Sequence, residues 1–77
     1  MAIYKVHIKT EGNDTTYTTN ATTFATITRH VDSGKFEVTT PNSMQLADTM
    51  EEADKIAREF TAKVMASVGV VPNFTKE

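Results

Sequence analysis

Cysteine and tryptophan are absent from this 77-residue chain, which contains only three glycines and two prolines. Without cysteine, neither a disulfide framework nor a cysteine-based zinc site can stabilise the fold. A chain of this length forms one small hydrophobic core, since a domain of about 60 residues buries only roughly 60% of its unfolded surface. We therefore expect a single domain over residues 1–77, stabilised by packing or by self-association.

A strong excess of charge of one sign is also absent. The net charge is -2; acids and bases balance over residues 1–40, and the excess of acid falls in residues 41–77. A general nucleic-acid binder carries a basic patch, because neutralising phosphates provides most of its non-specific affinity. The composition therefore disfavours such a binder, and it is not acidic enough for a mimic of DNA.

Long hydrophobic runs are absent as well. Polar residues recur at every second position near the N-terminus, at Lys5, His7 and Lys9, so we expect neither a signal peptide nor a membrane span there. The lack of cysteine is compatible with a reducing compartment. We expect a cytoplasmic protein, in the cytoplasm of the host cell if a phage encodes it.

Strand-like alternation dominates the first part of the chain. In residues 2–10, Tyr4, Val6 and Ile8 fall on one face of a strand, and the three basic residues fall on the other. The turn chemistry of Glu11–Asp14 then predicts a first hairpin.

Threonine is the commonest residue of the next segment, with eight between residues 15 and 31. Its branched β-carbon favours strands. We expect two strands, about 15–19 and 23–31, or one strand that is bent by a bulge near Asn20 and Ala21.

The segment Asp32–Lys35 predicts a further hairpin, because a type I turn followed by glycine joins antiparallel strands well. Its partner strand contains Phe36 and Val38 and ends at Pro41. Residues 44–47 are expected to add a short edge strand.

A change of hydrophobic period at Thr49 predicts a helix over residues 49–68, opened by a capping box between Thr49 and Glu52. The residues expected to face the sheet are Ala53, Ile56, Ala57, Phe60 and Val64. On the opposite face, acid-before-base pairs contribute about 0.2–0.5 kcal/mol each; they are Glu51–Lys55, Asp54–Arg58 and Glu59–Lys63.

The tail, residues 69–77, follows a glycine that suits a helix C-terminus and is more apolar than a frayed end requires. A second apolar patch is predicted outside the core arc of the helix, formed by Ala62, Met65, Ala66, Val68, Val70, Val71 and Phe74. Either the tail folds back over this patch, or the patch contacts a partner or a second copy.

Together these patterns predict an α+β fold. A small antiparallel meander of three to four strands occupies residues 1–47, and the single C-terminal amphipathic helix packs on one face of it. The other face stays open.

Residues typical of catalysis are few. His7 and His30 are the only histidines, and a metal site would need a third ligand from Asp14, Asp32 or Glu37. The serines lack the glycines of a nucleophile elbow, and no glycine loop suits a phosphate. We expect no enzyme activity, no metal and no cofactor; a small metal protein or enzyme that uses the two histidines is the alternative.

A weakly basic stripe on the open face is a second candidate site. It would contain Lys5, His7, Lys9, Arg29 and Lys35 and would suit single-stranded nucleic acid. Aromatic side chains on which bases stack are missing from that face, so a solvated surface is the simpler interpretation.

The segment Leu46–Ala53 resembles the strand-to-helix passage of HicB-type antitoxins, in which an Asp-Thr-x-Glu-Glu-Ala stretch follows a small sheet. The resemblance covers about a dozen residues, and the Pro-Gly-Cys segment that precedes this passage in that family is absent. It implies an antitoxin-like accessory of transcription as an alternative function.

The lack of catalytic motifs and the presence of an open sheet face and strand edges favour a small, non-catalytic protein-binding module. We expect a stoichiometric inhibitor or regulator of a host or defence complex, encoded by a phage or mobile element, with an anti-CRISPR-like role as one form. The expected partner-binding residues are Glu51, Glu52, Lys55, Glu59, Ala62, Met65, Ala66 and Phe74. A homodimer is expected through a sheet edge or through the C-terminal apolar patch.

Overall fold

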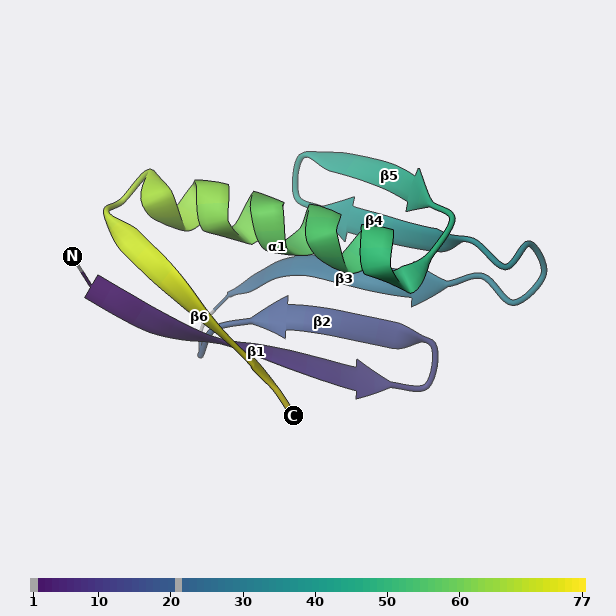
Figure 1. The fold of residues 1–77 in the computed structure, drawn as a ribbon, viewed down its shortest axis with the longest axis horizontal. Coiled ribbons are helices and arrows are strands. Elements are labelled where there is room, and N and C mark those ends of the chain that lie inside the picture. The colour runs from purple at the N-terminus through teal and green to yellow at the C-terminus, as the bar shows by residue number, and fades with distance from the viewer. Residues whose placement is uncertain (1, 21) are drawn as a thin grey trace.

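The computed structural model describes residues 2–20 and 22–77. The elements are, in chain order, β1 (Ala2–Glu11), β2 (Asp14–Thr18), β3 (Thr23–Arg29), β4 (Phe36–Thr40), β5 (Ser43–Ala47), α1 (Met50–Ala66) and β6 (Val70–Lys76). All six strands form one sheet in the order β5-β4-β3-β2-β1-β6, and α1 lies across one face (Figure 1). The fold is α+β with one helix, as predicted, but its sheet has more strands than the three to four expected.

The first five strands form an antiparallel meander. Gly12 and Gly34 adopt positive φ angles, 59° and 74°, in the turns after β1 and β3, where an L side chain would be strained. Residues 15–31 form two strands, with a register shift between Tyr17 and Thr18. Of the predicted bend at Asn20 and Ala21, the second residue lies outside the described part of the chain.

The tail forms the sixth strand. It pairs with β1 in parallel, from Ala2 opposite Val70 to Ile8 opposite Lys76. The expectation of a purely antiparallel sheet is therefore wrong at this edge, because α1 crosses the sheet from the β5 edge and delivers the chain to the β1 edge in the parallel sense. The tail therefore folds back within the monomer, but it does not cover the whole predicted patch: Val68 and Val71 are 74% and 39% exposed, and their contact with a partner or a second copy stays a prediction.

The core lies between α1 and one face of the sheet, here called the helix face; the opposite face is called the open face. Its buried residues are Val6, Ile8, Tyr17, Ala25, Ile27, Val38 and Ala47 from the sheet and Ala53, Ala57 and Met65 from the helix, with Thr61 beside them. Small side chains let the helix approach the strands closely. The buried Thr61 hydroxyl donates a hydrogen bond to the Ala57 carbonyl at 2.8 Å, so this polar group has a partner in the core.

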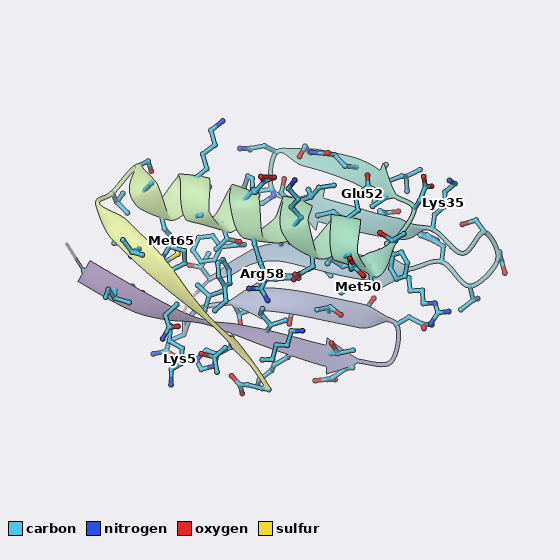
Figure 2. All side chains as sticks on the ribbon, in the orientation of Figure 1. Lys5, Lys35, Met50, Glu52, Arg58 and Met65 are labelled. Atoms are coloured by element: carbon cyan, nitrogen blue, oxygen red, sulfur yellow. The ribbon has the colours of Figure 1, made fainter. Side chains whose placement is uncertain are left out.

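The buried stripe of α1 is rotated from the predicted one. Ala53 and Ala57 face the sheet as expected, while Ile56 and Phe60 are half-buried and Val64 is exposed. Met65, predicted to lie off the core arc, is only 3% exposed and points toward the sheet (Figure 2), so that prediction is wrong. The buried stripe is one i, i+4 row of the helix, in which the small residues Ala53, Ala57 and Thr61 permit a close helix-to-sheet approach and Met65 continues the row.

The two ends of α1 are close to the predicted chemistry. The Thr49 hydroxyl oxygen accepts from the Glu52 N–H at 3.1 Å, which confirms the N-cap half of the predicted capping box; the return bond from the Thr49 N–H to the Glu52 carboxylate is not among the hydrogen bonds of the described residues. Gly69 has a φ of 75° and begins the reversal that leads into β6. No helix in residues 2–20 and 22–77 is long and apolar enough to cross a membrane.

Candidate functional site

At one end of the molecule, β1 extends past its neighbour β2. Pairing with β2 begins only at His7, whereas pairing with β6 begins at Ala2. Residues 2–6 of β1 therefore have a described strand on one side only, and this end of the sheet is a two-stranded ribbon (Figure 1). We call the space on the other side of residues 2–6, where β2 does not reach, the notch.

The backbone of β1 presents hydrogen-bonding groups to the notch. The Glu77 N–H donates to the Ile8 carbonyl at 2.9 Å, so Ile8 faces β6. Because successive residues of a strand point their backbone groups to opposite sides, Tyr4 and Val6 also face β6, while Ile3 and Lys5 face the notch. Two N–H donors and two carbonyl acceptors thus line this stretch of edge.

Hollows lie on both sides of this backbone. One has a volume of about 560 Å³ and is lined by Ile3, Tyr4, Lys5, His7, Thr19 and Asn20. The other, of about 240 Å³, lies under the C-terminal end of α1 and is mainly apolar, lined by Tyr4, Thr19, Phe24, Val64, Met65, Ser67, Val68 and Val70. Tyr4 and Thr19 belong to both hollows, which therefore flank the notch on the two faces of the sheet.

The rim of the notch is unusually apolar for an exposed surface. Ile3 is 69% exposed, Tyr4 56% and Val68 74%. Ile3 lies on the open face, opposite Val71 of β6, while the other two lie on the helix side. Exposed apolar side chains therefore border the notch on both faces of the sheet, which favours an interaction site.

The charge beside the notch is positive. Lys5, His7 and Lys9 lie on the open face of β1, as predicted. The His7 Nδ1 atom contacts the Glu77 carboxylate. In the described part of the chain no carboxylate lies within 4.0 Å of the Lys5 ammonium, which leaves this cation available to an acidic group.

The remaining members of the predicted basic stripe lie elsewhere. Arg29 belongs to the helix face, since it follows Ala25 and Ile27 at two-residue spacing. The Lys35 ammonium donates to Asp48 at 2.6 Å, beside the start of α1. The prediction of a five-residue stripe is therefore wrong. Acids also lie beside the three bases of β1 on the open face, among them Glu11, Asp14 and Glu37, and Glu77 contacts His7.

The two histidines do not share a site. His7 is level with Thr18 near the notch, whereas His30 follows β3 at its far end and contacts Glu37 at 3.0 Å. Within residues 2–20 and 22–77 no three His, Cys, Asp or Glu side chains are close enough to hold one metal ion. Each histidine has its own carboxylate partner instead.

The predicted partner-binding residues of the helix separate into two groups. Four charged residues of α1 remain exposed at the surface: Glu51, Glu52, Lys55 and Glu59. Of the apolar ones, Ala66 is exposed and Ala62 half-buried, while Met65 lies in the core. Phe74 belongs to β6, packs edge-on against the Tyr17 ring at the border of the core, and is only half-buried.

A polar cluster ties α1, β2 and β6 together. The Tyr17 hydroxyl donates to the Asp54 carboxylate, which also accepts from the Arg58 Nε at 3.0 Å. The Arg58 guanidinium lies 5.0 Å from the centre of the Phe74 ring, a cation–π distance. Burial, and then the hydrogen bond and charge of Asp54, raise the pKa of Tyr17 above its ordinary value of 10.0.

Because the pKa of Tyr17 is raised, the free energy of unfolding depends on pH in the alkaline range. In the unfolded chain Tyr17 loses its proton near pH 10.0, whereas the folded protein holds it to higher pH. Its contribution is therefore full below about pH 10 and falls as the pH rises further. We expect the urea midpoint to drop from about pH 9 to about pH 11 more steeply than in Tyr17→Phe. The pKa of Lys35 is raised by Asp48, but Lys35 is present in both proteins, so its effect cancels in the comparison. Equal pH slopes of the urea midpoint in the two proteins would contradict the role assigned to Tyr17.

No protein-family model, curated protein or solved structure matches this chain. The site is therefore interpreted from its own geometry: an apolar notch with free backbone groups and one available cation.

Proposed function

We propose that this chain is a non-catalytic protein-binding module that captures an extended segment of a partner protein in the notch. The observation that carries the proposal is the combination of unshared backbone groups at Ile3 and Lys5 with an apolar pocket directly beside them. A peptide strand that adds to a sheet edge gains main-chain hydrogen bonds, and pockets for alternate side chains select its sequence. Occupying the partner's segment in this way would make the protein a stoichiometric inhibitor or regulator.

The geometry defines the chemistry of the captured segment. Such a strand would continue the line of β2, so its side chains would alternate between the two faces of the sheet. Those level with Tyr4 would enter the apolar pocket under α1, and those level with Lys5 would emerge on the open face near its ammonium. We therefore expect a segment in which an apolar residue alternates with an acidic one.

We expect a modest binding free energy and a clear preference for one kind of sequence. Burying one large apolar side chain in the pocket contributes about 1.5–3 kcal/mol. Each backbone hydrogen bond adds about 0.5–1.5 kcal/mol net. Sequence choice then depends on the pocket and on Lys5, since the backbone bonds are the same for every sequence.

A peptide of alternating leucine and glutamate is the probe for this site, and one of alternating leucine and lysine is its control. We expect the acidic peptide to shift the NMR amide signals of Ile3 and Lys5, and Lys5→Glu to weaken binding about tenfold, equivalent to about 1.4 kcal/mol. Lys9→Glu is the matched variant, because Lys9 shares strand and face with Lys5 but lies opposite Thr16 of β2. Equal losses in the two variants would show a general charge effect and refute the notch.

A backbone variant tests the strand-addition geometry separately. The N–H of Ile3 points into the notch and is not used by β6, so Ile3→Pro should remove one donor while the fold persists. We expect unchanged circular dichroism and binding of the acidic peptide weakened several-fold. Retention of full affinity would exclude main-chain pairing at this edge, and binding of single-stranded DNA with steep salt dependence would favour nucleic acid as the occupant.

A further inference from the structure

The two outer edges of the sheet differ in their ability to pair. In β6, the Glu77 N–H points to β1, so by alternation those of Asn73 and Thr75 do too, and position 72 points outward. That position is Pro72, which has no N–H. The middle of the β6 edge therefore lacks a donor, which is a common protection against strand addition.

The β5 edge has no such protection. A two-residue turn joins β4 and β5. The pair that closes this turn is Thr40 and Ser43, and two residues further along the strands Val38 lies opposite Gln45. The closing pair of such a hairpin is the hydrogen-bonded kind, so the backbone groups of Met44 and Leu46 point outward by alternation. The strand Ser43–Ala47 contains neither proline nor a charged residue.

The same two residues carry the edge's apolar side chains. Met44 is 60% exposed and Leu46 58%, and both lie on the open face, opposite Thr39 and Glu37 of β4. Further in, this face is occupied mainly by threonines and charged residues. The large apolar side chains of this outermost strand are therefore an exception on a polar face, and they favour an interaction surface there.

We propose that β5 pairs antiparallel with β5 of a second copy, about a twofold axis at Gln45. In this register Met44 lies opposite Leu46 of the second copy, and the reverse, so the outward backbone groups of both strands meet directly. The two methionines and two leucines form one apolar cluster on the open face. Because the strand is uncharged, self-pairing brings no like charges into contact.

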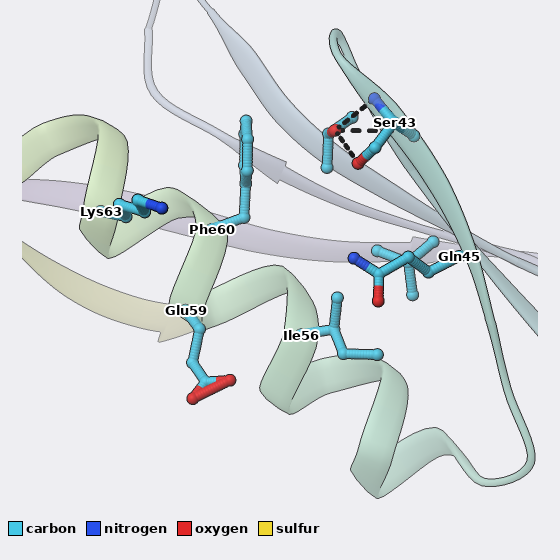
Figure 3. A pocket seen from close by; sticks show the side chains of 8 residues that line it. Ser43, Gln45, Ile56, Glu59, Phe60 and Lys63 are labelled. Carbon is cyan, nitrogen blue, oxygen red and sulfur yellow. Dashed lines mark hydrogen bonds between the residues drawn. The ribbon is translucent and has the colours of Figure 1, made fainter.

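The helix side of this interface is also suited to a second copy. A hollow of about 270 Å³ lies between α1 and β5, with Ile56 and Phe60 facing β5 and Gln45 opposite them (Figure 3). Glu59 and Lys63, one acid and one base, stand at its rim. The two copies' Gln45 side chains would meet beside this hollow and exchange amide hydrogen bonds.

The dimer leaves the proposed peptide site free, because β5 and β1 are separated by three strands. Loss of peptide binding at the notch would therefore leave dimerisation through β5 unchanged, and the reverse. A five-residue strand is a small interface, so we expect a dimer of micromolar affinity.

Disulfide trapping tests the register, because the chain contains no cysteine of its own. Directly opposite residues that do not exchange backbone bonds have Cα atoms about 4.5 Å apart, within the range for a disulfide. We expect oxidised Gln45→Cys to form a covalent dimer with high yield. Met44→Cys is the matched control, since it lies next to Gln45 on an exposed edge but two residues out of register with its own copy; we expect little cross-linking.

Sedimentation equilibrium of the full chain gives the second measurement. We expect a monomer–dimer equilibrium whose dissociation constant rises at least tenfold in Leu46→Lys, which places a charge in the apolar cluster. Thr26→Lys, on the same face but on the inner strand β3, should leave it unchanged. A wild-type chain that is monomeric at millimolar concentration, or equal cross-linking of Gln45→Cys and Met44→Cys, would overturn the proposal.

Discussion

Deletion of residues 70–77 is expected to produce a chain that does not fold. The deletion removes β6, uncovers Val6 and Ile8 of β1, and takes Phe74 away from Tyr17. Loss of one large aromatic side chain from a core costs about 3–5 kcal/mol, and a small domain has only about 5–15 kcal/mol in total. Far-UV circular dichroism and urea titration should show no cooperative transition.

Two variants control for simple shortening of the chain. Phe74→Ala keeps the strand and should lower the free energy of unfolding by about 3 kcal/mol, below the effect of the deletion. Val71→Ser changes an exposed position of the same strand and should be nearly neutral. A deletion protein with a cooperative transition would show that β6 is a dispensable appendage.

Tyr17→Ala is expected to be the most damaging single substitution of the core. Tyr17 has no exposed surface, and its ring lies 6.5 Å from that of Phe74 at an interplanar angle of 80°. The substitution removes this edge-on contact, leaves a cavity beneath α1 and deprives Asp54 of a hydrogen-bond donor. We expect a loss of about 3–5 kcal/mol in the free energy of unfolding, measured by urea titration.

Tyr17→Phe separates the ring from the hydroxyl. It keeps the packing but leaves Asp54 with Arg58 alone, so we expect a loss of about 1–2 kcal/mol. Asp54 is partly exposed and solvent can replace the missing donor, which keeps this cost small. A loss in Tyr17→Phe as large as that in Tyr17→Ala would mean that the hydroxyl, and not the ring, connects the helix to β2.

The local sequence predicted those parts of the fold that depend on neighbouring residues. The hairpin turns at Gly12 and Gly34, the break in the threonine-rich segment and the cap at Thr49 all follow from short-range chemistry. The sixth strand was not predicted, because its pairing with β1 joins the two ends of the chain. The alternation of Val70 and Phe74 inward with Val71 and Asn73 outward was the available signal, but Pro72 weakened it.

The candidate site was even less accessible to sequence reasoning. Lys5, His7 and Lys9 were placed on the correct face, yet the notch exists only because β2 ends at Thr18 while β1 continues to Ala2. That length difference depends on the register of two hairpins and on β6, none of which a single segment encodes. The assignment of Met65 failed for a related reason: the helix buries the i, i+4 row that continues from Ala53 and Ala57, and which row meets the sheet depends on packing against strands far away in the sequence.

The parallel pairing of β1 and β6 also determines when the molecule can fold. During synthesis β1 emerges well before β6, the strand that pairs with its edge, and the Glu77 N–H can bond to the Ile8 carbonyl only after β6 has emerged. Contacts between distant parts of a chain slow folding because the intervening loop must be closed before they form. Until that moment the apolar edge of β1 stays unpaired on the emerging chain. We therefore expect a late, nearly all-or-none folding step and a nascent chain that is vulnerable to aggregation.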